Sequence, residues 1–254
     1  MYKRQELYVR RYLKNEIPDV IVNVVVASNL ERNLYLTTEL IDMDYRMVIA
    51  LNMFDELEQS GGKIDYKHLG NMIGVPIVPT VSRSGKGVNQ LFDTIIEVYE
   101  GRDESVRHVH VGLGKVIENS ITPLKDLLKK DPTCNREFSP RYLAIKILEG
   151  DTEVKRMLEG SESYTELMNI RNAEVEKIET TLNEDIESAI ANEKYGFISG
   201  ALAETYRPGD KEEAKTTRII DSFVTNKLFG FPIFIFLMWL MFEATFSIGA
   251  YPME

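Results

Sequence analysis

The chain has 254 residues, enough for one large domain or two smaller ones, each with a hydrophobic core. Its 30 basic and 40 acidic side chains give a formal net charge of −10, and such an acidic chain repels phosphate backbones, so we expect no nucleic-acid partner. One cysteine, Cys134, rules out a disulfide framework within the chain, and the charged first residues lack the apolar core of a secretory signal.

Strand and helix patterns alternate over the first hundred residues. Three short apolar runs have the character of strands buried on both faces: residues 20–26, 47–51 and 75–78. Three segments with apolar residues at helical spacing follow them in turn: residues 30–41, 65–73 and 91–99. This alternation predicts an α/β fold with a parallel sheet, whose ligands bind at the carboxyl ends of the strands.

Several helix ends carry their own signals. Ser28 is suited to cap the first helix, because Glu31 follows three residues later and can bond back to the cap amide. Asp65 is a candidate N-terminal cap of the second helix, and Gly74 suits a left-handed C-terminal cap.

Helical patterns dominate the next hundred residues. Residues 108–111 are predicted to form a short strand, and helices are expected over 116–128 and 142–148. One long helix is expected over 164–192, where a single apolar stripe faces Glu- and Lys-rich surfaces. A turn over 206–210 ends this all-α region.

The C-terminal run 228–253 is apolar except for Glu243. Because about 20 residues of helix span a bilayer core, we predict one transmembrane helix over 228–254. Basic residues precede this run and none follows it, so the positive-inside rule predicts that residues 1–227 lie in the cytoplasm, at the inner (plasma) membrane. Glu243 is either a functional group within the span or a group near its interface.

A polar motif directly follows the second predicted strand. Asn52, Met53 and Asp55 form an N-x-x-D pattern that resembles the guanine-specificity motif of small GTPases. A carboxylate at Asp55 only accepts hydrogen bonds, so it can take them from guanine N1–H and N2–H₂. Adenine lacks this pair of donors and would be rejected. An ordinary polar loop is the alternative interpretation.

A glycine-rich loop follows the third predicted strand. Residues 80–87 resemble the second base-contacting loop of GTPases, in which backbone N–H groups meet guanine O6. On that match Val81, Ser82 and Arg83 are the predicted contacts. The alternative is a plain strand-to-helix turn. No catalytic residue and no metal ligand is predicted, because His108 and His110 alone are too few for a metal site.

Three longer stretches narrow the resemblance. Residues 27–36, 138–151 and 230–253 are similar, in this order, to the GTP-binding domain, the helical spacer domain and the first membrane helix of the ferrous iron transport protein B family. The resemblance implies a GTP or GDP ligand, Mg²⁺ in the intact protein, Fe²⁺ as the transported ion and attachment to a membrane. Homo-oligomerisation through the membrane domain stays open.

The chain also departs from the family pattern. The phosphate-binding G-x-x-x-x-G-K-[ST] loop, the Mg²⁺-contacting Thr and the D-x-x-G turn are not found, and Val26 stands where the family has Asp. We therefore expect the C-terminal half of a GTP-binding domain, without its phosphate-loop half and without most of the membrane domain, and inactive alone. The expected divisions are 1–103 (partial GTP-binding domain), 104–208 (helical domain), 209–227 (cytoplasmic linker) and 228–254 (transmembrane helix).

Three functions fit these observations. The first is a fragment of a GTP-dependent Fe²⁺ transporter, with guanine recognition and a regulatory helical domain. The second is a membrane-tethered regulatory GTPase without transport activity. The third is a nucleotide-free adaptor whose helical domain binds a partner. Further membrane segments would favour the first function, and a true start at Met1 would favour the third.

Overall fold

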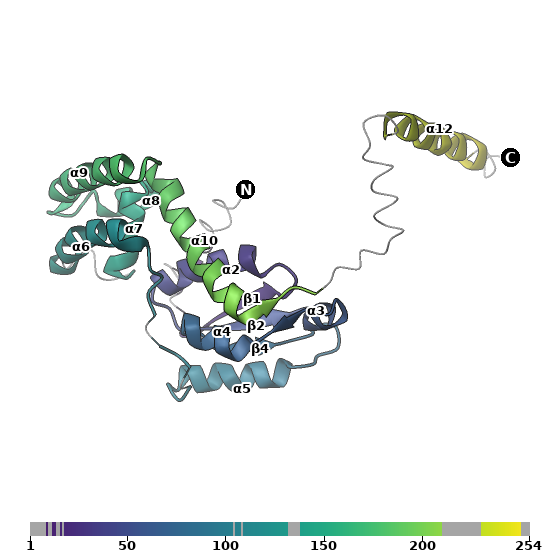
Figure 1. The fold of residues 1–254 in the computed structure, drawn as a ribbon, viewed down its shortest axis with the longest axis horizontal. Coiled ribbons are helices and arrows are strands. Elements are labelled where there is room, and N and C mark those ends of the chain that lie inside the picture. The colour runs from purple at the N-terminus through teal and green to yellow at the C-terminus, as the bar shows by residue number, and fades with distance from the viewer. Residues whose placement is uncertain are drawn as a thin grey trace. The chain divides into compact units, whose positions relative to one another are not determined.

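The computed structural model covers most of the chain (Figure 1). The residues it describes are 9, 12, 13, 16, 18–103, 105–107, 109–131, 138–209 and 230–249. They belong to two compact units, Met1–Gly209 and Asp210–Glu254. Cys134 and His108 lie outside the described residues.

A parallel sheet forms the centre of the first unit. Its strands β1 (Ile21–Val26), β2 (Met47–Asn52) and β4 (Ile77–Pro79) lie in the order β1-β2-β4. The register pairs Ile21 with Met47 and Val26 with Asn52. Residues 47–51 of the middle strand are all buried, as expected for a strand covered on both faces. The predicted α/β fold with a parallel sheet is confirmed.

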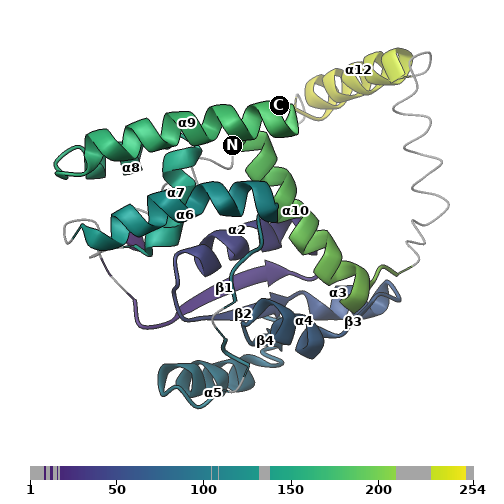
Figure 2. The same cartoon turned by 60° about the vertical axis from the view of Figure 1, so that its left-hand side comes forward.

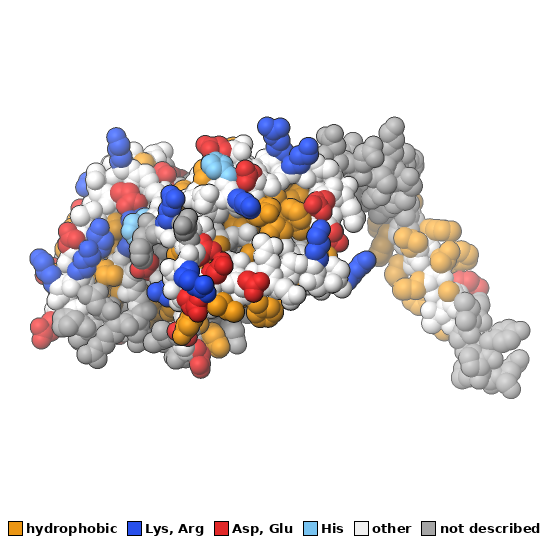
Figure 3. Space-filling view, turned by 90° about the horizontal axis from the view of Figure 1, so that it is seen from below, with side chains coloured by type: hydrophobic (Ala, Val, Ile, Leu, Met, Phe, Trp, Pro, Cys, Tyr) orange, Lys and Arg blue, Asp and Glu red, His pale blue; other side chains and the backbone are white. Residues whose placement is uncertain are grey.

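Helices cover both faces of this sheet (Figures 1 and 2). α2 (Leu30–Asp42) and α4 (Tyr66–Ile73) lie on one face, and α5 (Val88–Tyr99) lies on the other. Neighbouring β2 residues point to opposite sides, so Ile49 joins the main core while Val48 packs with Val98 of α5. The outer side of α5 exposes Phe92, Ile96 and Tyr99. From this side Figure 3 shows apolar patches among charged side chains.

The predicted helix caps are partly correct. The Asp65 side chain accepts a hydrogen bond from the His68 N–H at 2.9 Å, and Gly74 ends α4 with φ of 71°. The Ser28 prediction is wrong, because α2 begins after Asn29 and has no side-chain cap bond. Glu31 does not bond back to the cap, since its Oε1 accepts from the Ser199 hydroxyl at 2.7 Å instead.

The rest of the first unit is helical. Its helices are α6 (Gly114–Lys130), α7 (Pro140–Leu148), α8 (Thr152–Leu158), α9 (Tyr164–Leu182) and α10 (Ile186–Thr205). The strand predicted over 108–111 is wrong for its described residues, 109–111, which form no strand. The carbonyl of Val111 accepts from the Arg141 guanidinium at 2.7 Å, so a side chain occupies the group that a neighbouring strand would use.

The long helix predicted over 164–192 is two helices. Asn183 ends α9 with a left-handed φ of 55°, and Asp185 starts α10 by accepting from the Ser188 N–H at 2.9 Å. The apolar stripe continues on both sides of this break, so periodicity alone could not reveal it.

α10 returns the chain from the helices to the sheet. It packs against α2 and α4, and one hydrophobic core runs from Leu34 of α2 to Leu167 of α9. Beyond α10, β5 (Tyr206–Arg207) pairs antiparallel with β3 (Lys63–Ile64), which follows α3 (Phe54–Gln59). The first two residues of the predicted turn 206–210 are thus a strand.

The second unit contains α12 (Gly230–Gly249), whose described apolar side chains are mostly exposed. Among the described residues, no helix combines the length and apolar character needed to cross a membrane. The prediction of a transmembrane helix over 228–254 is therefore not supported.

Candidate guanine-nucleotide site

Two loops meet at the edge of the sheet where β2 and β4 end. Asn52 is the last residue of β2, and Thr80 directly follows β4. The Thr80 N–H donates to the Leu51 carbonyl at 2.8 Å, and the Phe54 N–H donates to the Thr80 carbonyl at 3.3 Å. Adjacent parallel strands thus bring both predicted base-contacting loops to the same place.

The side chain of Asn52 joins the two loops. Its Oδ1 accepts from the Ser82 N–H at 3.0 Å and from the Ser82 hydroxyl at 2.9 Å. Because a backbone N–H only donates, this contact decides which way the Asn52 amide faces. Within the described residues the Nδ2 group of Asn52 has no hydrogen-bond partner, so it remains available to an acceptor on a ligand.

Met53 turns the chain between Asn52 and Asp55. Its φ of 58° lies in the left-handed region, which is unusual for a residue other than glycine. α3 begins at once with Phe54, so Asp55 lies in the first turn of a helix, where a carboxylate is favoured. The described residues offer the Asp55 carboxylate no hydrogen bond or ion pair, and the side chain is half-buried.

The second loop is closed at its base. Val81 donates its N–H to the Lys86 carbonyl at 3.0 Å, and the two residues form a bridge. Gly87 has φ of 79°, and a Cβ there would lie 2.1 Å from the Pro79 carbonyl oxygen. Only glycine therefore allows the end of the loop to pack this closely on the end of β4.

The three residues predicted in the second loop have different environments. Val81 is buried and its N–H is used within the loop, while the Ser82 N–H is used by Asn52. Arg83 is exposed, and its N–H has no partner within the described part of the chain. The backbone N–H groups of Val81 and Ser82 thus already have partners within the loops, and the assignment of Val81, Ser82 and Arg83 as guanine contacts stays a prediction.

Two cavities in the described part of the chain are lined by residues other than the predicted site residues. The larger one, of about 270 Å³, is an open groove between α4 and α5. Its walls include Tyr66, Asn71, Gln90 and Thr94.

No cluster of three or more metal-ligating side chains occurs in the residues that the structure describes. His110 is exposed there.

Comparison with known proteins identifies the family. The family model described as "Ferrous iron transport protein B" matches residues 1–95, and the model described as "FeoB cytosolic helical domain" matches residues 114–207. A GDP-bound mutant of the S. thermophilus FeoB G-domain is 32% identical, with a TM-score of 0.69, over 79% of this chain and 74% of that chain. The chain belongs to the ferrous iron transport protein B family. Its α/β domain is a GTPase-type domain, joined to the helical domain of that family.

Curated FeoB relatives are much longer. A Porphyromonas gingivalis Fe(2+) transport protein A/Fe(2+) transporter FeoB fusion protein is 43% identical over 100% of this chain and 30% of its own length. The Fe(2+) transporter FeoB of Staphylococcus aureus strain MSSA476 is 30% identical over 96% of this chain and 36% of its own length. The chain thus spans about a third of these relatives.

A second FeoB structure also has a bound nucleotide. The mGMPPNP-bound NFeoB from S. thermophilus is 33% identical, with a TM-score of 0.66, over 77% of this chain and 70% of that chain. GDP and mGMPPNP are thus found on proteins with the fold of this chain.

The comparisons correct one expectation. The match to the family's N-terminal model begins at residue 1, so the chain lies in the N-terminal GTP-binding domain from its first residue. They do not support the expectation that the chain lacks the phosphate-loop half of this domain. The sequence supports only the statement that its 254 residues contain no G-x-x-x-x-G-K-[ST] motif.

Proposed function

We propose that this chain recognises the guanine base of GTP or GDP at the edge of the sheet formed by β2 and β4. One observation carries the proposal: Ser82 in the second loop donates two hydrogen bonds to Asn52 in the N-x-x-D motif. Two motifs 30 residues apart therefore form a single polar surface at the position where parallel sheets bind ligands.

Each residue has a distinct role in this proposal. Asp55 accepts hydrogen bonds from guanine N1–H and N2–H₂, and the Nδ2 group of Asn52 donates to an acceptor on the base. The backbone N–H of Arg83 donates to O6. Ser82 and Val81 support the loop, and Met53 supplies the left-handed turn that places Asp55 in the first turn of α3.

The residues present do not fit a phosphate-bound Mg²⁺ ion. The Ser or Thr of the phosphate loop and the Asp of a D-x-x-G turn have no counterpart in the sequence, and the described residues contain no metal-ligating cluster. We therefore propose no GTP hydrolysis by this chain. The purified chain should not turn over GTP, and detectable turnover would contradict this proposal.

We further propose that the chain serves as the nucleotide-recognising and helical part of an Fe²⁺ transporter. The relatives that support this are named Fe(2+) transporters, and the chain corresponds to 30% and 36% of their lengths. The proposed divisions are a GTP-binding region over 1–103, a regulatory helical region over 104–208 and a linker over 209–227. The family matches to 1–95 and 114–207 and the unit boundary after Gly209 support them.

Substituting Asp55→Asn tests base recognition. Xanthine has N1–H but carries a carbonyl at position 2, so an Asn amide can accept from N1–H and donate to that oxygen. Wild-type chain should bind guanosine diphosphate in preference to xanthosine diphosphate by NMR titration, and Asp55→Asn should reverse the preference. Glu56→Gln removes the same charge from the adjacent exposed position and should reverse nothing. An unchanged preference in Asp55→Asn would contradict the assignment.

A second candidate function, a nucleotide-free adaptor, is favoured by the missing G-x-x-x-x-G-K-[ST] motif. An immunoblot against the segment 164–192 separates the two functions. A native band much larger than 29.1 kDa supports the transporter, while a band at 29.1 kDa supports the adaptor.

A further inference from the structure

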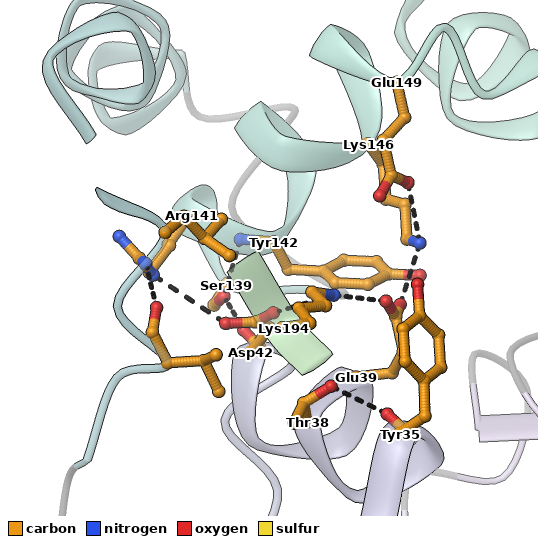
Figure 4. A network of polar contacts seen from close by, with 12 residues as sticks. Tyr35, Thr38, Glu39, Asp42, Ser139, Arg141, Tyr142, Lys146, Glu149 and Lys194 are labelled. Atoms are coloured by element: carbon orange, nitrogen blue, oxygen red, sulfur yellow. Dashed lines mark hydrogen bonds and ion pairs between the residues drawn. The ribbon is translucent and has the colours of Figure 1, made fainter. Parts of the chain in front are cut away.

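A cluster of charged side chains, most of them buried, lies between α2 and the helical domain (Figure 4). We call it the joint cluster. Its carboxylates and cations are Glu39 and Asp42 of α2, Glu118 of α6, Arg141 and Lys146 of α7, Glu149 at the end of α7, and Lys194 of α10. Four helices of the first unit therefore meet through ionised groups, at the surface where the helical domain packs on the GTPase-type domain.

Glu39 is the carboxylate of the joint cluster whose negative charge is balanced by two close lysines. Lys194 pairs closely with its Oε1, and the Nζ of Lys146 lies 2.8 Å from its Oε2. Burial alone would raise the pKa of Glu39, but these two cations outweigh burial and lower that pKa to about 2. Glu39 is therefore ionised, and it is the nearer of the two carboxylates that pair with Lys194.

Arg141 is likewise committed to another carboxylate. Its two terminal nitrogens donate to both oxygens of Glu118, at 2.7 and 2.6 Å, and one of them also donates to the Val111 carbonyl at 2.7 Å. This bidentate contact uses the part of the guanidinium that forms strong, directional bonds. Only the Nε of Arg141 faces Asp42, at 3.8 Å from Oδ1.

Asp42 differs from the other carboxylates. Its side chain has no exposed area, and within the described residues neither carboxylate oxygen has a hydrogen-bond donor of acceptable geometry. Its nearest cation is Lys194, whose Nζ lies 3.2 Å from Oδ2. The Ser139 hydroxyl, which lies close by, donates instead to the backbone carbonyl of Asp42 at 2.6 Å.

The charges of the joint cluster balance only when one carboxylate is protonated. Fully ionised, it has four negative groups against three positive ones. An unbalanced charge in a buried site is costly, whereas a neutral carboxylic acid is tolerated far better. Protonation of a single carboxylate therefore leaves three ion pairs and no excess charge.

Asp42 is better placed than Glu149 to hold that proton. Burial raises the pKa of both groups. Glu149, however, keeps 16% of its side chain exposed and accepts from Lys146 at 2.8 Å. The Asp42 side chain has no exposed area, and it shares its nearest cation, Lys194, with Glu39. The other groups around Asp42 are Glu39, Lys194 and Arg141, with Lys146 and Tyr35 beyond them. The exposed His110 faces Glu118 rather than Asp42.

We propose that Asp42 is a proton-binding switch at the joint between the GTPase-type domain and the helical domain. When Asp42 is protonated the joint cluster is neutral and the helical domain is held firmly on α2. When Asp42 loses its proton the buried excess charge loosens this attachment. The switch depends only on the joint cluster and not on nucleotide binding.

If Asp42 holds this proton, the free energy of unfolding should fall as the pH rises. The folded protein holds the Asp42 proton to a higher pH than the unfolded chain, whose Asp side chains titrate near pH ~3.9. Stability is therefore lost as the pH rises from that value through the folded-state pKa, and it levels off above it. Over this window the unfolding equilibrium constant should rise by up to about tenfold per pH unit.

Asp42→Asn keeps the shape of the side chain and removes its titration. Denaturant unfolding of the full chain from about pH 4 to pH 9 should show this rise in wild type and not in Asp42→Asn. The control Asp126→Asn removes an exposed carboxylate of α6 and should follow wild type. Equal pH dependence in wild type and Asp42→Asn would overturn the proposal.

A second measurement covers the case in which Asp42→Asn fails to fold. Carbon-13 NMR of the wild-type side-chain carboxyls should show one aspartate that titrates well above the usual range. Hydrogen exchange of α10 amides, corrected for the intrinsic pH effect, should accelerate as that group ionises. An Asp42 carboxyl that titrates at or below the usual value for an aspartate, or α10 protection independent of its titration, would also refute the switch.

Discussion

Gly87 is the residue on which the fold of the second predicted base-contacting loop most directly depends. Its left-handed φ and its contact with the Pro79 carbonyl both exclude a side chain. Gly87→Ala should lower the free energy of unfolding by about 2–4 kcal/mol in urea titrations, because a left-handed conformation and a backbone clash act together.

Gly101→Ala is the matched control for this substitution. Gly101 has φ of +70°, but nothing lies within 4 Å of the added Cβ, so only the conformational penalty of about 1 kcal/mol should remain. Equal losses in the two variants would show that the contact with Pro79 does not constrain the loop.

The residues of the candidate site could be chosen from the sequence, but the hydrogen bonds between them could not be predicted from it. Asn52 and Asp55 stand at a recognisable spacing after an apolar run, so a pattern was enough to select them. The bond from Ser82 to Asn52 depends on β2 pairing with β4 and on the folding of the second loop, which no local pattern contains. The joint cluster was missed because its members come from four helices, and each resembles an ordinary charge on a helix surface.

Among the elements, the break between α9 and α10 decides how the helical domain returns to the sheet. Asn183 holds a left-handed conformation there. Asn183→Ala should cost about 1 kcal/mol of stability, while Asn183→Gly should cost nothing, since glycine adopts this conformation freely. Thermal unfolding by circular dichroism distinguishes them, and an alanine variant as stable as the glycine variant would argue against a strained cap.

Periodicity predicted strands and helices where one apolar face is buried locally. The strands 20–26 and 47–51 and the helix 30–41 lie close to the observed β1, β2 and α2. The same method failed at Asn183, because a stripe of apolar residues does not record a change of chain direction. It also missed β3 and β5, which are two residues each and too short for any period to show.

For the whole first unit, the joint cluster adds buried ion pairs to the hydrophobic core that joins the helical domain to α2. Lys194→Met should destabilise the chain by about 3–5 kcal/mol, because it leaves buried carboxylates without their cation. Lys177→Met is the control: this lysine is 57% exposed in its pair with Glu174, and its loss should cost less than about 1 kcal/mol. Similar losses in urea unfolding of both variants would mean that the joint cluster adds no special stability.

The central proposal is that the loops at the carboxyl ends of β2 and β4 bind a guanine base. The most direct test is a two-dimensional amide NMR titration of the purified chain with guanosine and adenosine diphosphates at equal concentrations. Guanosine diphosphate should shift the amides of residues 52–55 and 81–86, and adenosine diphosphate should leave them in place. Equal shifts with both nucleotides, or none at these residues with either, would contradict the claim.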